Sequence, residues 1–433
     1  MRIRYLVVAA VGVLLGLGIA ALLVTIVVRQ QEARLTYFKV VEIPQDEPDS
    51  AVWGRNFPVQ YEAFVKTMRT SELVRYSAFG RYGGSEAFSK LDRHPDYVKI
   101  FAGNPFSVEY NEDRGHMWAL KSVQTTKRLG EAKPGTCMTC KSSDVPRLMR
   151  TLGVAQFYAT PMKDLIVTQN IRHPIGCADC HDAGTMALRI TRPAFVEGMR
   201  ARGIDVRRAT RQEMRTYVCA QCHVEYYFRG AGKYLVFPWA RGLTIERIEA
   251  YYDDLKFADW SHEITRAPMI KVQHPEFELW STGNHARSGV ACADCHMPYR
   301  RVGAVKISDH WVRTPLANIQ NTCMTCHRQS ERELRSRVLE AQGRTFQLLG
   351  QGERAILDAI AEIERAMREG VGDEALAAAR ALHRKAQTRW DFISAENSMG
   401  FHSPQEAVRI LGDAIDLARQ AEIAALRAPR PKR

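Results

Sequence analysis

An uncharged, apolar stretch occupies the start of the chain. It runs from Tyr5 to Val28 and is flanked by Arg4 and Arg29. In a helix its 24 residues span about 36 Å, more than the roughly 30 Å hydrocarbon core of a bilayer. A cleaved signal peptide has a shorter apolar segment and a small-residue cleavage site, which does not follow here. Residues 1–29 are therefore predicted to be a transmembrane anchor or an uncleaved signal, and a retained anchor is favoured.

Helical periodicity dominates the last hundred residues. Apolar residues recur every three or four positions in two runs, at Ile356, Ile360, Ile363 and Met367, and at Leu376, Ala379, Leu382, Ala386, Trp390 and Ile393. A polar break at 369–373 separates the runs, and a third helix should begin at Ser403 and Pro404. Residues 331–433 are thus predicted to be a region of long helices. These helices either pack against the rest of the chain or form a dimer interface.

The chain between these regions has little long-range periodicity. Residues 30–58 are polar and contain Pro44, Pro48 and Pro58, which predicts a linker. Residues 59–330 break into many short segments and contain all ten cysteines. The spacing of these cysteines indicates the function of this part of the chain.

The cysteines form five Cys-x-x-Cys pairs, whereas random placement would give roughly 0.2 such pairs. The pairs are Cys137 and Cys140, Cys177 and Cys180, Cys219 and Cys222, Cys292 and Cys295, and Cys323 and Cys326. A histidine directly follows four of them: His181, His223, His296 and His327. Cys-x-x-Cys-His is the attachment signature of c-type haem, in which each cysteine forms a thioether and the histidine ligates the iron.

Three other uses of these cysteines fit less well. Ten cysteines could form five disulfides, but the spacing is too regular. Zinc sites combine two pairs, or one pair with two histidines, and five pairs is an odd number. Thioredoxin-like redox pairs occur once per domain. The pattern therefore predicts five covalently bound haems, which would form much of the core of residues 59–330. The predicted fold is mainly α, a multihaem cytochrome c fold with little β-sheet.

Lys141 is the exception, because it stands where the other four motifs have histidine. A lysine amine can ligate iron only when neutral, so burial and the metal must lower its pKa. The alternative is a degenerate motif whose iron takes a ligand from elsewhere. From the motif alone, lysine ligation is favoured.

The predicted haems indicate the cellular location of the protein more clearly than its charged residues do. Haem attachment takes place on the outer face of bacterial membranes, which predicts a periplasmic or extracytoplasmic body. Charges on both sides of the apolar stretch do not orient it. The net charge of +13 is dispersed, so no nucleic-acid partner is expected. A basic surface could instead draw small anions toward a site.

The motif order, one Cys-x-x-Cys-Lys followed by four Cys-x-x-Cys-His, resembles the pentahaem, ammonia-forming cytochrome c nitrite reductases. The resemblance covers roughly residues 53–420 and extends to segments without cysteines, at 114–117, 126–130 and 268–275. It implies six-electron reduction of nitrite to ammonium at a lysine-ligated haem fed by four bis-histidine haems. It also implies a homodimer and an electron donor, such as a membrane quinol-oxidising multihaem cytochrome.

The resemblance implies roles for residues that the motifs do not reveal. The substrate would face Tyr226, His274 and one basic residue, which is Arg128 or the alternative Lys127. The implied calcium ligands are Glu225, the backbone of Tyr226 and Lys271, and the side chain of Gln273. Distal iron ligands would be His116 for the Cys219 haem, His310 for Cys177, His402 for Cys292 and His285 for Cys323. Without the family, Glu225 would be read as an ion-pair partner and His274 as a core histidine.

Two other functions remain open at this stage. A membrane-anchored electron-transfer cytochrome would need protein ligands on both faces of every haem. The same type of enzyme could also act mainly on hydroxylamine or sulfite. His94, His173, His262 and His383 receive no functional role.

Overall fold

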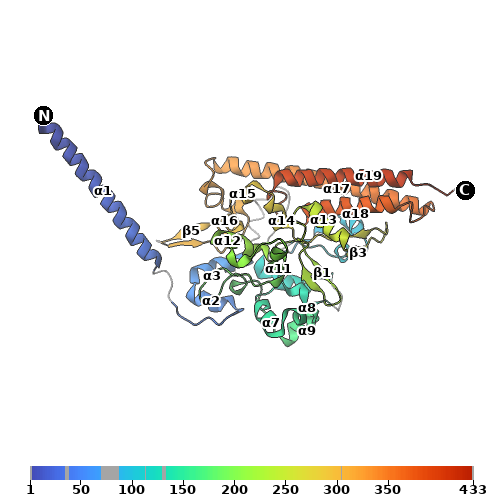
Figure 1. Cartoon of the computed structure of the whole chain (residues 1–433), viewed down its shortest axis with the longest axis horizontal. Helices are drawn as coiled ribbons and strands as arrows, with labels where there is room; N and C mark the ends of the chain where they lie inside the picture. Colours follow the sequence, from blue (N-terminus) through green and yellow to red (C-terminus); the bar gives the residue numbers. More distant parts are fainter. Residues whose placement is uncertain are drawn as a thin grey trace.

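A body of packed helices and one separate N-terminal helix make up the computed structural model (Figure 1). The structure describes residues 2–34, 39–69, 87–112, 114–128, 133–303 and 305–431. Part of the predicted linker (35–38) and the end of the 126–130 segment (Leu129 and Gly130) lie outside these residues. Helices predominate, and the strands form three two-stranded antiparallel sheets within the described part of the chain. The prediction of a mainly α fold with little β-sheet is confirmed.

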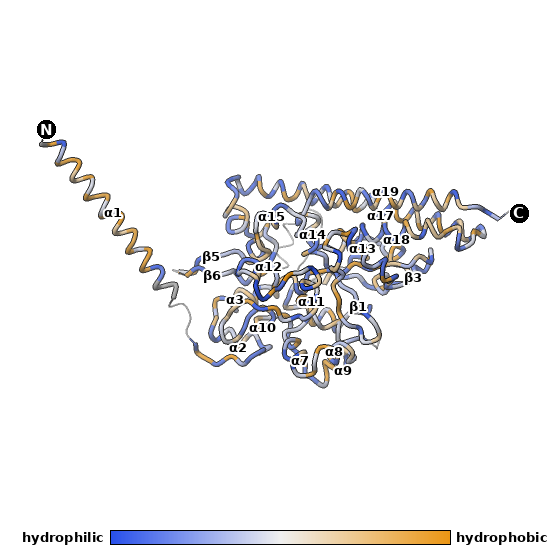
Figure 2. Tube along the Cα trace, in the orientation of Figure 1, coloured by the Kyte–Doolittle hydropathy of each residue, from blue (hydrophilic) through white to orange (hydrophobic). Residues whose placement is uncertain are grey.

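Helix α1 (Arg2–Arg34) contains the apolar stretch. Among the described residues, Ile3–Gln30 is the one helical segment long and apolar enough to cross a membrane, and it is not buried against the body. Figure 2 shows apolar residues along most of its length. Its side chains therefore present an uncovered apolar surface.

Three long helices, α17 (Glu331–Arg368), α18 (Ala377–Ser394) and α19 (Pro404–Arg427), pack side by side along one side of the body (Figure 1). The Ser330 side chain caps α17 by accepting a hydrogen bond from Glu333 N. Pro404 begins α19 as predicted, and the Ser403 side chain before it makes no cap hydrogen bond. Gly352 allows α17 to approach α18, because a Cβ there would meet Trp390 Cδ1 at 2.8 Å. The predicted long C-terminal helices are confirmed.

These helices also pack against the body. Ile356 and Ile360 of α17 and Trp390 of α18 share one apolar cluster with Tyr97 and Tyr252 from the central region. Packing is therefore one role of the long helices, and the dimer interface stays a prediction.

The elements of the central region are short. The helices are α2 (Ser50–Asn56), α3 (Pro58–Val65), α4 (Lys90–Arg93), α5 (Tyr97–Ile100), α6 (Ala119–Thr125), α7 (Val145–Leu152), α8 (Val154–Ala159), α9 (Met162–Thr168), α10 (Cys177–Cys180), α11 (Pro193–Ala201), α12 (Arg211–Ala220), α13 (Ile245–Asp254), α14 (Glu276–Ser281), α15 (Asn284–Arg287) and α16 (Cys292–His296). The strand pairs are β1 (Tyr227–Arg229) with β2 (Tyr234–Val236), β3 (Trp260–Ser261) with β4 (Pro268–Met269), and β5 (Tyr299–Val302) with β6 (Val305–Ser308).

The packed body begins before residue 59, where the sequence placed its start. Trp53 in α2 is buried, and its indole Nε1 donates to Glu47 O at 2.9 Å. Asp46 pairs with Arg189 at 2.7 Å. Residues 39–58 of the predicted linker thus lie against the body.

Two histidines without a predicted role form a buried pair. The rings of His262 and His383 lie 5.1 Å apart, and Thr265 interacts with Nδ1 of each ring. Burial lowers the pKa of His262 to about 4, and burial and the neighbouring His262 lower the pKa of His383 to about 3. Both rings are therefore neutral in the folded protein at neutral pH.

This pair predicts a loss of stability in weak acid. In the unfolded chain both rings take up protons below pH ~6.5, whereas the folded protein does not until about pH 4, so acid favours unfolding. Each histidine should cost up to roughly 1.4 kcal/mol per pH unit across that window. Thermal unfolding from pH 7.5 to 5 should show a shallower pH slope for His383→Gln than for wild type. Identical slopes would contradict this assignment.

Candidate functional site

Each of the five cysteine pairs lies on a helical turn, which brings positions i and i+3 to one face. The second and fourth pairs lie on α10 and α16, and the third begins at the end of α12. The first and fifth begin in the 3-10 turns η5 (Gly135–Met138) and η8 (Cys323–Thr325). In both Cys-Ala-Asp-Cys motifs the aspartate caps its own helix: Asp179 Oδ2 accepts from Gly176 N at 2.7 Å, and Asp294 Oδ2 accepts from Ala291 N at 2.8 Å. These turns hold the cysteines in the relative geometry that attachment to one haem requires.

Among the described residues the structure shows neither a disulfide nor a zinc-type cluster of cysteine and histidine side chains. All ten cysteines lie within the described residues, and all ten are free thiols. The same part of the chain contains no group of three or more histidine, cysteine, aspartate or glutamate side chains placed to hold a metal ion.

The spatial order of the five haem-attachment motifs differs from their order in the sequence. The thiol of Cys140 interacts with that of Cys222, and Cys219 interacts with Cys292. Cys295 lies near Cys323. The first motif is thus next to the third, the third next to the fourth, and the fourth next to the fifth. The second motif adjoins the third, because Cys180 interacts with Cys219 and Cys222.

Eight histidines form four pairs with one common spacing. The ring centroids are 6.2 Å apart in all four: His116 and His223, His181 and His310, His285 and His327, and His296 and His402. A metal–nitrogen bond of about 2 Å on each side accounts for some 4 Å of such a separation. The distance from each nitrogen to its ring centre supplies the rest. These are the four pairings that the family resemblance implies, and they leave room for one iron between the rings.

The second ring nitrogen of several of these histidines is already held. His181 Nδ1 lies 2.9 Å from Met186 O, His296 Nδ1 3.2 Å from Arg313 O, and His310 Nδ1 2.9 Å from Ser308 O. His402 Nδ1 lies 2.5 Å from Glu396 Oε1. Such partners orient a metal-ligating histidine and leave Nε2 for the metal. The residues therefore fit haem iron.

Lys141 has different surroundings from the histidines that end the other motifs. It is half-buried three residues after the end of η5, and its backbone N donates to Met138 O at 3.0 Å. Tyr226 is close to this motif and interacts with Cys140, Cys137 and Arg128. Burial raises the pKa of Tyr226 well above its usual value. The phenol therefore keeps its proton at neutral pH.

Arg128 also interacts with the first motif. Its guanidinium lies 4.1 Å from the Phe106 ring centroid, its Nε donates to Thr126 Oγ1 at 3.3 Å, and it interacts with Cys137. Lys127 is exposed. Of these two basic neighbours, Arg128 is the one whose charge acts on the first cysteine pair.

Glu225, Lys271 and Gln273 come together through hydrogen bonds. Glu225 is buried, and its carboxylate accepts from Gln273 N at 2.6 Å and from Tyr252 Oη at 2.8 Å. Gln273 Nε2 donates to Lys271 O at 2.9 Å, while Lys271 Nζ turns away to Asp391 at 2.9 Å. Burial raises the pKa of Glu225, two hydrogen bonds oppose this, and the acidic Glu278 and Asp259 raise it further. An oxygen-rich cluster with this excess of acidic groups fits a hard cation such as calcium.

His274 follows Gln273 and is thereby placed next to the Glu225–Tyr226 segment. Its Nδ1 lies 4.0 Å from Glu276 Oε1. Burial alone would raise the pKa of Glu276, but His223 and His274 lower it to about 2. His274 thus lies beside an ionised carboxylate.

The model of the cytochrome c552 family matches residues 49–430. The chain belongs to this family. A cytochrome c-552 of Bacteroides fragilis is 43% identical over 422 residues, covering 96% of this chain and 83% of the relative. The cytochrome c-552 of Porphyromonas gingivalis is 42% identical over 416 residues, covering 94% and 82%.

A solved structure that the chain resembles is the cytochrome c nitrite reductase of Desulfovibrio desulfuricans, whose catalytic subunit is described with two calcium sites. It superposes with a TM-score of 0.81 at 32% identity and covers 90% of this chain and 88% of its own. The predicted family and fold are therefore confirmed.

Three features of the site were not predicted from the sequence. They are the spatial order of the motifs, the carboxylate partner Glu396 of His402, and a buried arginine, Arg192, between the second and third motifs. The only available signal was weak: Arg192 stands between two haem motifs. Its contacts depend on the tertiary structure.

Proposed function

We propose that the protein reduces nitrite to ammonium at a haem attached to Cys137 and Cys140 and ligated by Lys141. One observation carries the proposal. Four motifs have paired histidines at a common spacing, whereas the first has Lys141, with Tyr226 and Arg128 beside its cysteines. Haems with two imidazole ligands have no free coordination position and only pass electrons. The lysine-ligated haem would offer its other face to a small anion.

When bound, this haem supplies the redox chemistry, in which six electrons and eight protons convert nitrite to ammonium and two waters. The chain binds the anion and moves the protons. Arg128 carries a permanent charge and fixed donors suited to an oxyanion. Tyr226 keeps its phenolic proton and can donate a hydrogen bond to a substrate oxygen. His274, beside the ionised Glu276, is placed to carry protons to that oxygen.

The contacts between motifs support a route for electrons. The series from the fifth through the fourth and third to the first motif would end at Lys141. A reaction that takes six electrons benefits from several donors held close together, because partly reduced nitrogen species then have less time to leave.

Calcium would bind at Glu225, Gln273 and the backbone of Lys271 and Tyr226. The Gln273 amide can turn to present its oxygen to the ion. Calcium would hold Tyr226 and His274 in register, because each follows one of these ligands in the sequence. It would also add positive charge near the substrate.

Glu225→Gln should weaken calcium binding at least about tenfold, because it removes the charged ligand from the site. Calcium titration of the dialysed holoprotein measures the effect. Glu197→Gln is the matched control, since Glu197 accepts from Tyr234 Oη at 2.8 Å near the surface. Equal calcium affinity in wild type and Glu225→Gln would rule out this ligand set.

The apolar Ile3–Gln30 segment supports a membrane anchor, with the catalytic body on the periplasmic or extracytoplasmic side. A quinol-oxidising multihaem cytochrome in the same membrane would be a suitable electron donor. Val408, Ile423 and Leu426 on α19 are exposed apolar residues, which supports a homodimer through the long helices.

The proposal is tested by supplying the holoprotein with nitrite and a reduced dye donor. We expect one ammonium for each nitrite consumed. Failure of the fully reduced protein to consume nitrite would refute the function. The ratios of kcat/KM for nitrite, hydroxylamine and sulfite would decide among the substrates.

A further inference from the structure

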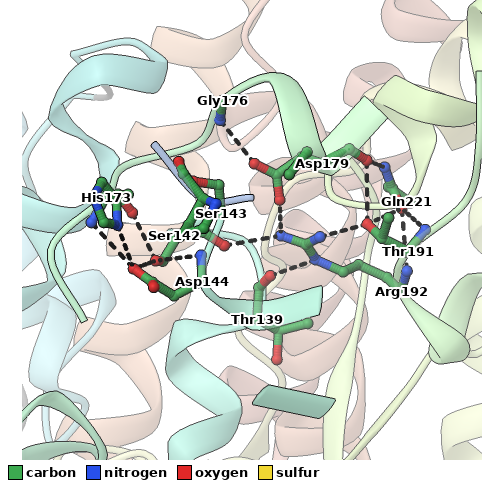
Figure 3. Close-up of polar contacts among 12 residues, drawn as sticks. Thr139, Ser142, Ser143, Asp144, His173, Gly176, Asp179, Thr191, Arg192 and Gln221 are labelled. Atoms are coloured by element: carbon green, nitrogen blue, oxygen red, sulfur yellow. Dashed lines mark hydrogen bonds and ion pairs between the residues drawn. The ribbon is translucent and has the colours of Figure 1, made fainter. Parts of the chain in front are cut away.

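Arg192 is one of the few charged side chains with no solvent exposure. It stands directly before α11, between the second and third haem-attachment motifs, and is 0% exposed. A buried charge is costly unless its donors are satisfied. Figure 3 shows its guanidinium at the centre of a network that joins segments far apart in the sequence.

Two of its bonds go to the backbone on either side of Lys141. Arg192 Nε donates to Thr139 O at 2.7 Å, and Nη2 donates to Ser142 O at 3.2 Å. Thr139 is part of the first Cys-x-x-Cys pair, and Ser142 directly follows Lys141. The planar guanidinium therefore fixes both ends of the segment that presents the lysine.

A third bond ties this segment to the second motif. Arg192 Nη2 lies 2.5 Å from Asp179 Oδ1, and Asp179 stands between Cys177 and Cys180. The other carboxylate oxygen of Asp179 caps α10, as described above. One carboxylate therefore holds the helical turn of the second haem site and balances the charge that holds Lys141.

The third motif joins through Gln221, which stands between Cys219 and Cys222. Its Oε1 accepts from Thr191 N at 2.9 Å and from Arg192 N at 3.2 Å. Its Nε2 donates to Asp179 O at 2.9 Å. The network therefore includes the residues between the two cysteines of three different motifs.

The far side of the Lys141 segment is also fixed. Ser142 Oγ donates to His173 O at 2.6 Å, and Asp144 Oδ2 accepts from His173 N at 3.2 Å (Figure 3). Arg192, together with the contact between Cys140 and Cys222, then connects this segment to the second and third motifs.

We propose that Arg192 is a positioning residue that sets the orientation of Lys141 toward its iron and keeps the first, second and third haem sites in register. The proposal rests on the proposed function in one respect, namely that Lys141 ligates iron. Arg192 acts through the backbone of residues 139–142 and does not touch the substrate. Lysine cannot replace it, because an ammonium lacks the fixed planar donors that reach three acceptors at once.

Arg192→Lys in the full-length holoprotein tests this directly. Arg215→Lys is a matched control. Arg215 is also buried and pairs with the equivalent aspartate of the fourth motif, Asp294, at 2.9 Å. Within the described part of the chain its other side-chain hydrogen bond goes to Ser308 and not to residues 139–142. Haem content, the electron paramagnetic resonance signal of the high-spin haem, and kcat and KM for nitrite are measured for both variants.

We expect both variants to keep five covalent haems. In Arg192→Lys the high-spin signal should split or lose at least about half its intensity, while the bis-histidine signals stay, and kcat should fall about tenfold with KM little changed. Arg215→Lys should leave the high-spin signal intact. An unchanged high-spin signal in Arg192→Lys would overturn the proposal, and so would an equal loss in Arg215→Lys.

Two further results keep the test decisive. If Arg192→Lys does not assemble, Asp179→Asn, which removes the charge partner, is judged by the same signal: an altered high-spin haem supports the proposal and an unaltered one overturns it. If wild type consumes no nitrite while Arg192→Lys still changes the high-spin signal, the proposed function fails and the positioning role stands.

Discussion

Lys141→His should retain all five haems and lose about a hundredfold or more in nitrite reduction. The haem stays because its thioethers come from Cys137 and Cys140, which the substitution leaves in place. Activity falls because changes even to outer partners of metal ligands typically cost 10–100-fold, and this one changes the ligand itself. The shorter, rigid imidazole would also move the iron relative to Arg128 and Tyr226. The pyridine haemochrome assay measures the retained haem, and steady-state kinetics with nitrite measures the loss of activity.

The matched control is Lys163→His, which makes the same replacement at an exposed position on α9. It should retain wild-type turnover. Unchanged turnover in Lys141→His would mean that catalysis does not need a lysine ligand. The first motif would then be a degenerate motif whose iron takes its ligand from elsewhere.

The second large effect is expected at Arg128. Arg128→Ala should lower kcat/KM for nitrite by about 10²–10³, the range seen when one preorganised donor to a developing oxyanion is removed. The loss should appear in both kcat and KM, since the guanidinium would meet the anion on arrival and during bond breaking. Steady-state kinetics at fixed ionic strength separates this from a general effect of surface charge.

Lys127→Ala removes the same charge one residue away, from an exposed side chain. Its kcat/KM should stay within about twofold of wild type, because exposed charges are screened by solvent and salt. Equal losses in the two variants would show that net charge, and not a specific guanidinium, guides the anion.

Most of the fold class could be predicted from the sequence. The periodicity of Ile356, Ile360 and Trp390 predicted the long C-terminal helices, because amphipathic helices reveal themselves by local spacing. The short elements of the central region could not be placed in the same way. The η5 turn and α10 are a single helical turn each, and their packing depends on distant segments and on haem.

The residues of the candidate site also fall into two groups, those that the sequence reveals and those that only the folded structure reveals. The cysteines, Lys141 and the proximal histidines follow from spacing, and the family resemblance supplies Arg128, Tyr226 and His274. Arg192 carries no motif, since its partners Thr139 and Asp179 are distant in sequence from it and from each other. Glu396 also belongs to no motif, because it comes into contact with His402 only in the folded chain. Long-range contacts of this kind leave no periodic trace in one sequence.

The measurement that tests the central claim most directly is a titration of the as-isolated holoprotein with cyanide, followed by absorption and electron paramagnetic resonance spectroscopy. The account predicts five haems per chain, one of them high-spin, and one cyanide bound per chain with loss of that signal. The four bis-histidine signals should not change. Five low-spin haems and no cyanide binding would contradict the account and identify the protein as an electron carrier.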